Sequence, residues 1–191
     1  MFIVLEGGEG VGKSTQAARL AARLERLGRK VVLTREPGGT PEGEAVRGLL
    51  VGRLGWCAQA EALLLNAARV QHLKRVIEPA LARGAVVVCD RFVHSTLAYQ
   101  GAGRGLDEAW LMALHRLATG DRWPDLALLL DLPGGRGIDR AQPGWFEGES
   151  AAFHARVAAA FRNMGLVHVD ASGSPDDVEE RIWAAVAARL R

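Results

Sequence analysis

A short stretch near the N-terminus has the residue types and the spacing that bind a chain of phosphates. Residues 7–14 read GGEGVGKS, which fits the pattern GxxxxGK(S/T) and lies between an apolar run and a segment of helical period. Glycines let successive backbone N–H groups point into one concavity, and the start of a helix adds partial positive charge. Lys13 would reach the β- and γ-phosphates of a nucleoside triphosphate, and the Ser14 hydroxyl would bind Mg²⁺. The residues predicted to contact the triphosphate are Gly7, Gly8, Glu9, Gly10, Val11, Gly12, Lys13, Ser14 and Thr15.

Two charged pairs, Asp90 with Arg91 and Arg35 with Glu36, each follow an apolar run. Ligands of open parallel sheets bind at the carboxyl ends of the strands, so we expect both pairs to face the phosphate loop. Asp90 and Ser14 form the predicted metal site, because a carboxylate there could hold Mg²⁺ or one of its water ligands. Arg91 and Arg35 are each suited to grip a second phosphate with two parallel hydrogen bonds. The alternatives are a surface ion pair for Asp90 and Arg91, and for Glu36 a pair with a neighbouring arginine.

Five continuous apolar runs predict the strands that must carry these residues. Continuous rather than alternating apolarity suits strands that are buried on both faces of a parallel sheet. Segments of helical character separate the runs, and this βαβ rhythm predicts an α/β fold. The expected strands are 2–5, 31–33, 85–89, 126–130 and 166–169, and the expected helices are 17–27, 58–81, 107–118, 150–163 and 175–190.

The composition is that of one packed domain, which we expect to span residues 1–191. The chain is 49% hydrophobic and 24% charged, so it can bury a core without disulfides. A net charge of +2 gives no support to nucleic-acid binding. No run approaches the roughly 18 apolar residues of a membrane span, and the N-terminal run is too short for a signal peptide, so we expect a cytoplasmic protein. Cys57 and Cys89 lack metal-site spacing and are expected to be buried thiols.

The class of phosphate-loop protein can be narrowed by what else the chain contains. GTPases carry a guanine-reading NKxD motif, which this sequence lacks. Large motor-type ATPases usually carry extra domains, for which 191 residues leave no room. Small kinases of nucleotides, nucleosides or other metabolites remain.

Further motifs are spread over the first two thirds of the chain. They are Glu9 inside the phosphate loop, TREPGGT at 34–40, AAR at 67–69, DRF at 90–92 and STLAYQG at 95–101. Together they resemble the thymidylate kinases, which phosphorylate dTMP to dTDP with ATP, and the resemblance runs from residue 2 to about 132 and resumes at 169–171. It implies a P-loop NTPase of adenylate-kinase-like fold, with a five-stranded parallel sheet flanked by helices and a short lid at about 133–149. It also implies ATP and dTMP as substrates, Mg²⁺ as cofactor, and a homodimer packed through its helices.

The resemblance also implies roles for single residues. In that family the phosphate-loop carboxylate, here Glu9, hydrogen-bonds the 3′-hydroxyl of dTMP. Arg69 and Gln100 would read the O4 and N3 edge of thymine, while Tyr99 would disfavour a ribose 2′-hydroxyl. Hydrogen bonding of this kind should reject cytosine nucleotides strongly and dUMP weakly. The predicted dTMP-binding residues are Glu9, Arg35, Glu36, Leu65, Arg69, Arg91, Thr96, Tyr99 and Gln100.

Catalysis is expected to need no general base, because the acceptor is already an anionic phosphate and positioning with charge neutralisation carries the rate. The resemblance is to the bacterial type, in which glycine at the position of Gly10 usually accompanies a catalytic arginine in the lid. The lid here is short and holds Arg136 and Arg140, of which we favour Arg140. A further departure is Leu65, which stands where the family usually places a phenylalanine that stacks on thymine. The predicted catalytic residues are Lys13, Arg91, Arg140 and Arg136.

Two other functions remain open from the sequence. A deoxynucleoside kinase also pairs a phosphate loop with a charged pair at a strand end, and Glu36 could then be the base toward a 5′-hydroxyl. A regulatory module could bind nucleotides without turnover. His72, His94 and His115 need no special role, and His94 is expected to be a loop histidine that faces solvent. The segment 171–174 is a candidate for contact with adenine, because it follows the last predicted strand.

Overall fold

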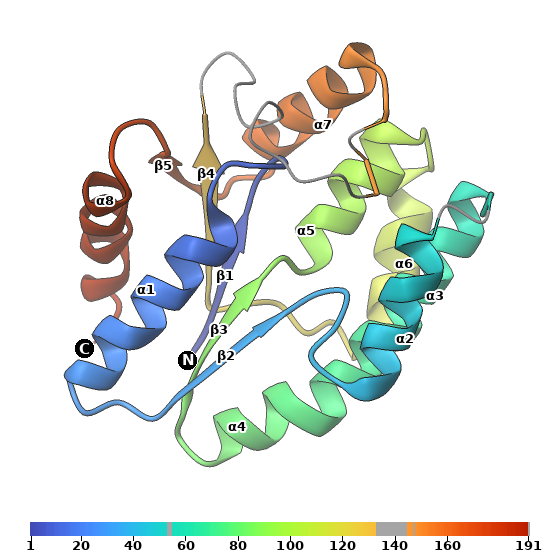
Figure 1. Cartoon of the computed structure of the whole chain (residues 1–191). Helices are drawn as coiled ribbons and strands as arrows, with labels where there is room; N and C mark the ends of the chain where they lie inside the picture. Colours follow the sequence, from blue (N-terminus) through green and yellow to red (C-terminus); the bar gives the residue numbers. More distant parts are fainter. Residues whose placement is uncertain (53–54, 133–144, 147, 191) are drawn as a thin grey trace.

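A sheet of five parallel strands organises the part of the chain that the structure describes, residues 1–52, 55–132, 145–146 and 148–190. The structure is a computed structural model, and its strand order is β2-β3-β1-β4-β5 (Figure 1). All five predicted strands are confirmed to within two residues at either end, and every pairing is parallel. The strands are β1 (Phe2–Glu6), β2 (Val31–Arg35), β3 (Val86–Asp90), β4 (Leu126–Asp131) and β5 (Val167–Asp170).

Helices occupy the connections between the strands and cover the sheet on both faces (Figure 1). Among the described residues, no helix has the length and apolarity needed to cross a membrane. All five predicted helical segments are confirmed as helical. The helices are α1 (Lys13–Arg26), α2 (Pro41–Val51), α3 (Ala58–His72), η1 (Leu73–Ile77), α4 (Glu78–Ala82), α5 (Val93–Thr96), η2 (Leu97–Gly103), α6 (Glu108–Thr119), α7 (Ala151–Asn163) and α8 (Pro175–Ala187), where η marks a π-helix.

Two connections are more helical than the sequence predicts. Helix α2 begins at a cap in which the Thr40 hydroxyl accepts a hydrogen bond from the Gly43 N–H, with Pro41 as the first helical residue. The segment after β3 forms α5 and then η2, and π-helical turns of this kind are frequent at functional sites. These pieces are too short or too irregular to show a clear apolar period. The predicted helix 58–81 likewise contains a π-helical turn, η1, between α3 and α4.

The strands are apolar throughout because helices cover both faces of the sheet. Side chains alternate along a strand, so Ile3 and Leu5 of β1 pack with α1 and α8, which lie against each other. Phe2 and Val4 point to the opposite face and pack with residues of α3, η1 and α6. A third cluster joins Tyr99 of η2 to α7 and the segment before it. This core holds the carboxyl ends of β1, β2 and β3 side by side, which is where the charged residues lie.

Two expectations about single residues are wrong. Cys57 is exposed, because it lies at the start of α3, whereas Cys89 is buried in β3 as expected. His94 belongs to α5 rather than to a loop, and it is only 7% exposed. Its ring packs against Trp123 with the ring centroids 5.4 Å apart, so it belongs to the interior and not to the surface.

Candidate active site

The phosphate loop connects β1 to α1, as its sequence pattern predicts. Gly7, Gly10 and Gly12 all have positive φ angles, of 136°, 67° and 92°. At Gly7 a Cβ atom would lie 2.4 Å from the backbone oxygen of Leu130, so only glycine fits this close approach. Within the part of the chain that the structure describes, no side chain caps the first turn of α1. Its free N–H groups and the helix dipole are therefore available to an anion.

Lys13 is the first residue of α1 and is only 6% exposed. Its Nζ donates to the backbone oxygen of Gly8, which holds the ammonium group across the loop. Burial, and after it the charge of Arg91, lowers the pKa of Lys13 from 10.5 to about 8, against the opposing effect of nearby carboxylates. A bound phosphate would stabilise this charge, so the loop is suited to bind an anion.

Ser14 and Asp90 meet although they lie 76 positions apart in the chain. The register of β1 against β3 pairs Leu5 with Asp90, which brings the end of β3 to the start of α1. Ser14 Oγ donates to Asp90 Oδ2 over 2.5 Å, and Asp90 Oδ1 is buried with no hydrogen-bond partner among the described residues. Such an orphaned carboxylate oxygen beside a hydroxyl offers hard oxygen donors to a divalent cation.

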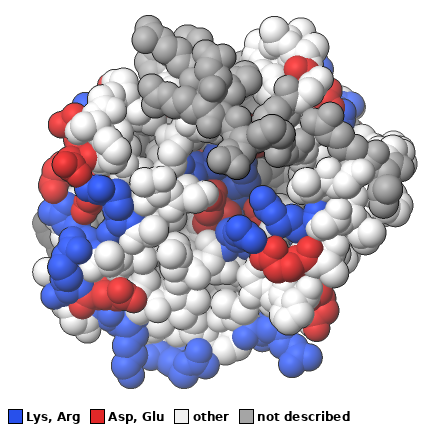
Figure 2. All heavy atoms as spheres, in the orientation of Figure 1, with Lys and Arg blue, Asp and Glu red and all other residues white. Residues whose placement is uncertain are grey.

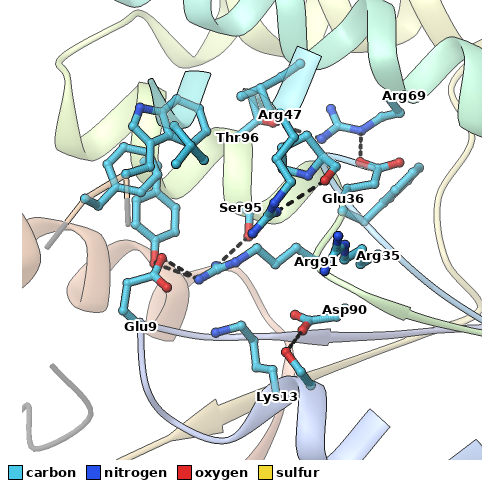
Figure 3. A pocket seen from close by; sticks show the side chains of 18 of the residues that line it. Glu9, Lys13, Arg35, Glu36, Arg47, Arg69, Asp90, Arg91, Ser95 and Thr96 are labelled. Carbon is cyan, nitrogen blue, oxygen red and sulfur yellow. Dashed lines mark hydrogen bonds and ion pairs between the residues drawn. The ribbon is translucent and has the colours of Figure 1, made fainter. Parts of the chain in front are cut away.

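Arg91 lies among the central side chains of the site in Figure 3, and its guanidinium contacts the phosphate loop at Gly7 and Glu9. Its φ angle of 73° is unusual for a residue other than glycine. The guanidinium donates to Gly7 O at 3.0 Å, Ser95 Oγ at 3.1 Å and Glu9 Oε1 at 2.6 Å. It also donates to the Tyr99 hydroxyl at 3.2 Å, which in turn donates to Glu9 Oε1 at 3.1 Å.

Glu9 is ionised by this arrangement despite its depth. Burial would raise the pKa of Glu9, but the charges of Arg91 and Lys13 outweigh burial, and with hydrogen bonds from Tyr99 and Arg91 they lower the pKa from 4.5 to about 2. The carboxylate therefore stays an acceptor at any physiological pH.

A second polar cluster lies away from the phosphate loop, where α3 faces β2 and α5. Arg69 is only 2% exposed, and it donates from Nε to Glu36 Oε2 at 2.8 Å and from Nη2 to Thr96 Oγ1 at 3.0 Å. Its Nη1 is buried and has no hydrogen-bond partner within the described part of the chain. His72 Nδ1 lies 3.0 Å from Glu36 Oε1, and His72 Nε2 lies 2.7 Å from Thr34 Oγ1. Both Glu36 oxygens are thus occupied, and the pairing with a neighbouring arginine is the alternative that the structure bears out.

One cavity of about 620 Å³ joins the two clusters, which is within the usual range for a ligand site. Figure 2 shows its side of the molecule, where Lys and Arg side chains gather with Asp and Glu around a central hollow. The residues that line this cavity were predicted from motifs far apart in the sequence. Leu65 is one of them, and its neighbours on α3 include no phenylalanine, tyrosine or tryptophan. The predicted residues in the lining are Glu9, Gly10, Gly12, Lys13, Ser14, Thr15, Arg35, Glu36, Leu65, Arg69, Asp90, Arg91, Thr96, Tyr99 and Gln100.

The remaining predicted residues stand outside that lining. Gly7, Gly8 and Val11 shape the loop without facing the cavity. Arg136 and Arg140 lie outside the described residues. Arg35 does line the cavity, but its guanidinium also pairs with Glu44 of α2, with Nη2 3.0 Å from Oε2.

The cavity contains residues that the sequence analysis did not identify. Arg47 of α2 lines it, and its Nη1 donates to the backbone oxygen of Pro37 at 3.3 Å. Burial and the neighbouring charge of Arg35 lower the pKa of Arg47. Phe146 lines the cavity as well, stacked on Tyr99 with the ring centroids 4.4 Å apart. The Thr40-Pro41 helix start was the signal that could have revealed α2, and with it Arg47.

Comparison with known proteins gives one consistent result. The thymidylate kinase family model matches residues 5–182. The chain belongs to the thymidylate kinase family. It is 51% identical to the thymidylate kinase of Cereibacter sphaeroides, covering 99% of this chain and 95% of that one, and 50% identical to the thymidylate kinase of Thermomicrobium roseum, covering 100% and 96%. The crystal structure of thymidylate kinase from Ehrlichia chaffeensis matches with a TM-score of 0.83 and 31% identity, over 97% of this chain and 98% of that chain.

Family membership confirms the fold predicted from the sequence. The five parallel strands flanked by helices are those of a P-loop NTPase with the adenylate-kinase-like arrangement of the thymidylate kinases. The match begins at Leu5, in the strand that precedes the phosphate loop, and it extends into α8. It therefore includes every cavity residue described above.

Proposed function

We propose that this member of the thymidylate kinase family transfers the γ-phosphoryl group of ATP to dTMP and so forms ADP and dTDP. A phosphate oxygen of dTMP attacks the γ-phosphorus, the new P–O bond forms, and the bond to the β-phosphate oxygen of ADP breaks. The observation that carries the proposal is the single cavity, which joins an intact phosphate loop to a second set of arginines and to a buried polar cluster suited to a nucleobase. Both substrates therefore have a place in one continuous space.

The ATP phosphates bind at the loop. Its N–H groups and the buried Lys13, whose pKa is lowered to about 8, lie at the same loop, and an anion stabilises both. Ser14 and Asp90 fit a Mg²⁺ ion that accompanies the triphosphate, since their oxygens are hard donors and Asp90 Oδ1 has no partner among the described residues. When bound there, Mg²⁺ supplies neutralising charge to the phosphates.

The acceptor phosphate binds between the loop and α2. Arg91 lies at the end of β3, and Arg35 and Arg47 face the same cavity from β2 and α2. Three guanidinium groups suit an acceptor that already carries a phosphate dianion, whereas a neutral hydroxyl acceptor has no negative charge for them to bind. Both oxygens of Glu36 are held by Arg69 and His72, which leaves no free carboxylate there for a base. These contacts favour a nucleotide kinase over a deoxynucleoside kinase.

The nucleoside of dTMP lies between Glu9 and Arg69. Glu9 is an ionised acceptor at the sugar, close to the Tyr99 hydroxyl, which leaves little room for a ribose 2′-hydroxyl. At the other end Arg69 has a buried Nη1 that lacks a partner among the described residues, and thymine O4 is an acceptor for it. Thr96 holds the same guanidinium, while Leu65 supplies an apolar wall for the base.

The transferred phosphoryl group needs positive charge on every side. We assign that role to Lys13, Arg91 and a lid arginine, Arg140 in preference to Arg136, as in members of the family that have glycine at the position of Gly10. We also propose that residues 1–191 act as one domain with 133–149 as its lid. We further propose that the protein acts in the cytoplasm.

A second copy of the chain is the proposed partner. Exposed apolar side chains lie on α2, α3 and α6. Helix α3 contacts both α2 and α6, and the three helices lie on one side of Figure 1. Exposed apolar side chains on neighbouring helices favour an interaction surface there. Light scattering should give twice the mass of one chain. The exposed residues on these three helices are Leu49 (41%), Val51 (38%), Leu63 (51%), Trp110 (38%) and Leu117 (87%).

Turnover on a panel of acceptors tests the proposed function. ADP formation from Mg·ATP would be measured with dTMP, dUMP, dCMP and thymidine, with Lys13→Ala as the control. The proposal expects fast turnover on dTMP, slower turnover on dUMP, and turnover on dCMP near background. Activity on thymidine without activity on dTMP would establish a deoxynucleoside kinase. Binding of dTMP and ATP without turnover on any acceptor would indicate a regulatory module.

A further inference from the structure

Glu61 is a buried carboxylate that no step described so far uses. It lies on α3, its residue is 4% exposed, and it is turned toward η2 rather than toward solvent. Its Oε2 accepts a hydrogen bond from Gln100 Nε2 at 3.2 Å. Gln100 is itself only 1% exposed and lines the cavity, so Glu61 stands directly behind a residue that faces the base.

A carboxylate can settle the orientation of the amide that it contacts. The Gln100 side chain has an accepting end and a donating end of nearly equal shape, and either could face the cavity. An ionised carboxylate accepts hydrogen bonds and donates none, so only the NH₂ end of Gln100 can face Glu61. The carbonyl oxygen of Gln100 must then point the other way, and it makes no hydrogen bond within the described residues.

Arg104 holds the Glu61 carboxylate in place through two contacts. Its Nη2 lies 3.2 Å from Glu61 Oε1, and its Nε lies 3.3 Å from Oε2. The guanidinium is fixed in turn by Glu149, at 2.7 Å from Nη1, and by the rings of Phe146 and Phe153, whose centroids are 5.8 Å and 5.5 Å away. A buried carboxylate with this support has no freedom to turn a donor toward Gln100.

We propose that Glu61 is a specificity-determining positioning residue, which turns the carbonyl oxygen of Gln100 toward the base so that the site accepts thymine and rejects cytosine. The inference rests on the proposed role of Gln100 in reading the base. Thymine presents an N3–H donor, which the carbonyl oxygen accepts. Cytosine presents an N3 acceptor, which would face that oxygen without a proton between them and leave both groups unpaired.

Glu61→Gln tests the inference, because an amide at position 61 can either accept or donate and no longer dictates the orientation of Gln100. The measurement is the ratio of the inhibition constant for dCMP to the KM for dTMP. We expect this ratio to fall by about tenfold, with kcat for dTMP within about threefold of the wild type, as for one misplaced hydrogen bond. Glu25→Gln, on the exposed side of α1, is the matched control and should leave the ratio unchanged.

A swap variant separates orientation from loss of structure. In Glu61→Gln with Gln100→Glu, the new amide donates to a carboxylate at position 100, whose other oxygen can only accept from the base. The ratio should return to within about threefold of the wild-type value, whereas a structural defect would deepen in the double variant. Equal losses for dTMP and dCMP in Glu61→Gln, with no recovery in the swap, would overturn the inference.

Two further variants keep the result decisive. If Glu61→Gln does not fold, Glu61→Gln with Arg104→Gln removes both charges of the pair together and carries the same expected fall in the ratio. Gln100→Ala tests the role on which the inference rests. An unchanged ratio in Gln100→Ala would contradict the proposed role of Gln100 in reading the base. A lowered ratio in Gln100→Ala together with an unchanged ratio in Glu61→Gln would contradict only the role of Glu61.

Discussion

The two ends of the cavity are built in different ways. At the phosphate loop, eight consecutive residues supply backbone N–H groups, a lysine and a hydroxyl, so the groups that bind the triphosphate are mostly local in the chain. At the nucleoside end, single side chains come from α3, α5 and η2, and their orientation depends on buried partners such as Glu36, directly after β2, and Glu61. A local site depends on backbone conformation, whereas a dispersed site depends on the packing of the whole fold. The two ends should therefore respond differently to substitution.

Removal of the lysine should break catalysis at the loop and leave the other end intact. In Lys13→Ala we expect kcat to fall by roughly 10³-fold, because a preorganised charge on the transferred phosphoryl is lost. Steady-state ADP formation measures this effect. The nucleoside end does not involve Lys13, so dTMP should still raise the melting temperature of the variant as it does in the wild type. A variant that lost dTMP binding as well would show that the two ends are not separable.

Removal of the buried arginine should damage the fold itself. In Arg69→Met, Glu36 keeps only His72 as a side-chain partner among the described residues. We expect the free energy of unfolding to fall by about 3 kcal/mol, as for a broken buried ion pair. Urea denaturation measures the loss. Arg162→Met is the matched control, because Arg162 pairs with Asp131 at the surface and should cost no more than about 1 kcal/mol. Equal losses in both variants would contradict the account of the nucleoside end.

Titration of the loop should be visible in the pH dependence of ATP binding. Burial lowers the pKa of Lys13 to about 8 in the free protein, so Lys13 loses its proton as the pH rises through that value. Since phosphates bind the protonated form, kcat/KM for Mg·ATP should fall about tenfold per pH unit above pH 8. In the complex with ATP the phosphates hold the proton on Lys13, so kcat should stay level to a higher pH. A kcat/KM for Mg·ATP that stays level up to pH 10 would rule out this behaviour.

The smallest expected effect concerns the wall of the nucleoside end. Leu65→Phe places an aromatic ring beside the base, and stacking of about 0.5–1 kcal/mol should lower the KM for dTMP by roughly threefold. The KM for ATP should not change. Leu27→Phe, at the exposed end of α1, is the control and should change neither constant. An increase in the KM for dTMP in Leu65→Phe would mean that the wall is already filled and that the ring overpacks it.

The difference between the two ends also explains what the sequence could predict. The strands and the phosphate loop depend on local pattern, and the charged pair Asp90-Arg91 follows from its place at a strand end. Arg47 was not predicted as a site residue, because it lies on α2 and the apolar residues of this short helix show no clear helical period. The sequence predicts an arginine partner for Glu36 as an alternative, without identifying the arginine, and it predicts no partner for Gln100. The pairs Glu36–Arg69 and Glu61–Gln100 form only through the packing of α3 against β2 and η2, which no spacing in the sequence encodes.

The fate of the transferred phosphorus tests the central claim most directly. With ATP labelled at the γ-phosphorus and unlabelled dTMP, a cavity that holds both substrates should move the label to the β-position of dTDP, in amounts equal to the ADP formed. Lys13→Ala should reduce both products together. Label recovered as inorganic phosphate instead of dTDP would contradict the account. The account would also be contradicted if no label entered dTDP and the same label entered dTMP when thymidine replaced dTMP as the acceptor.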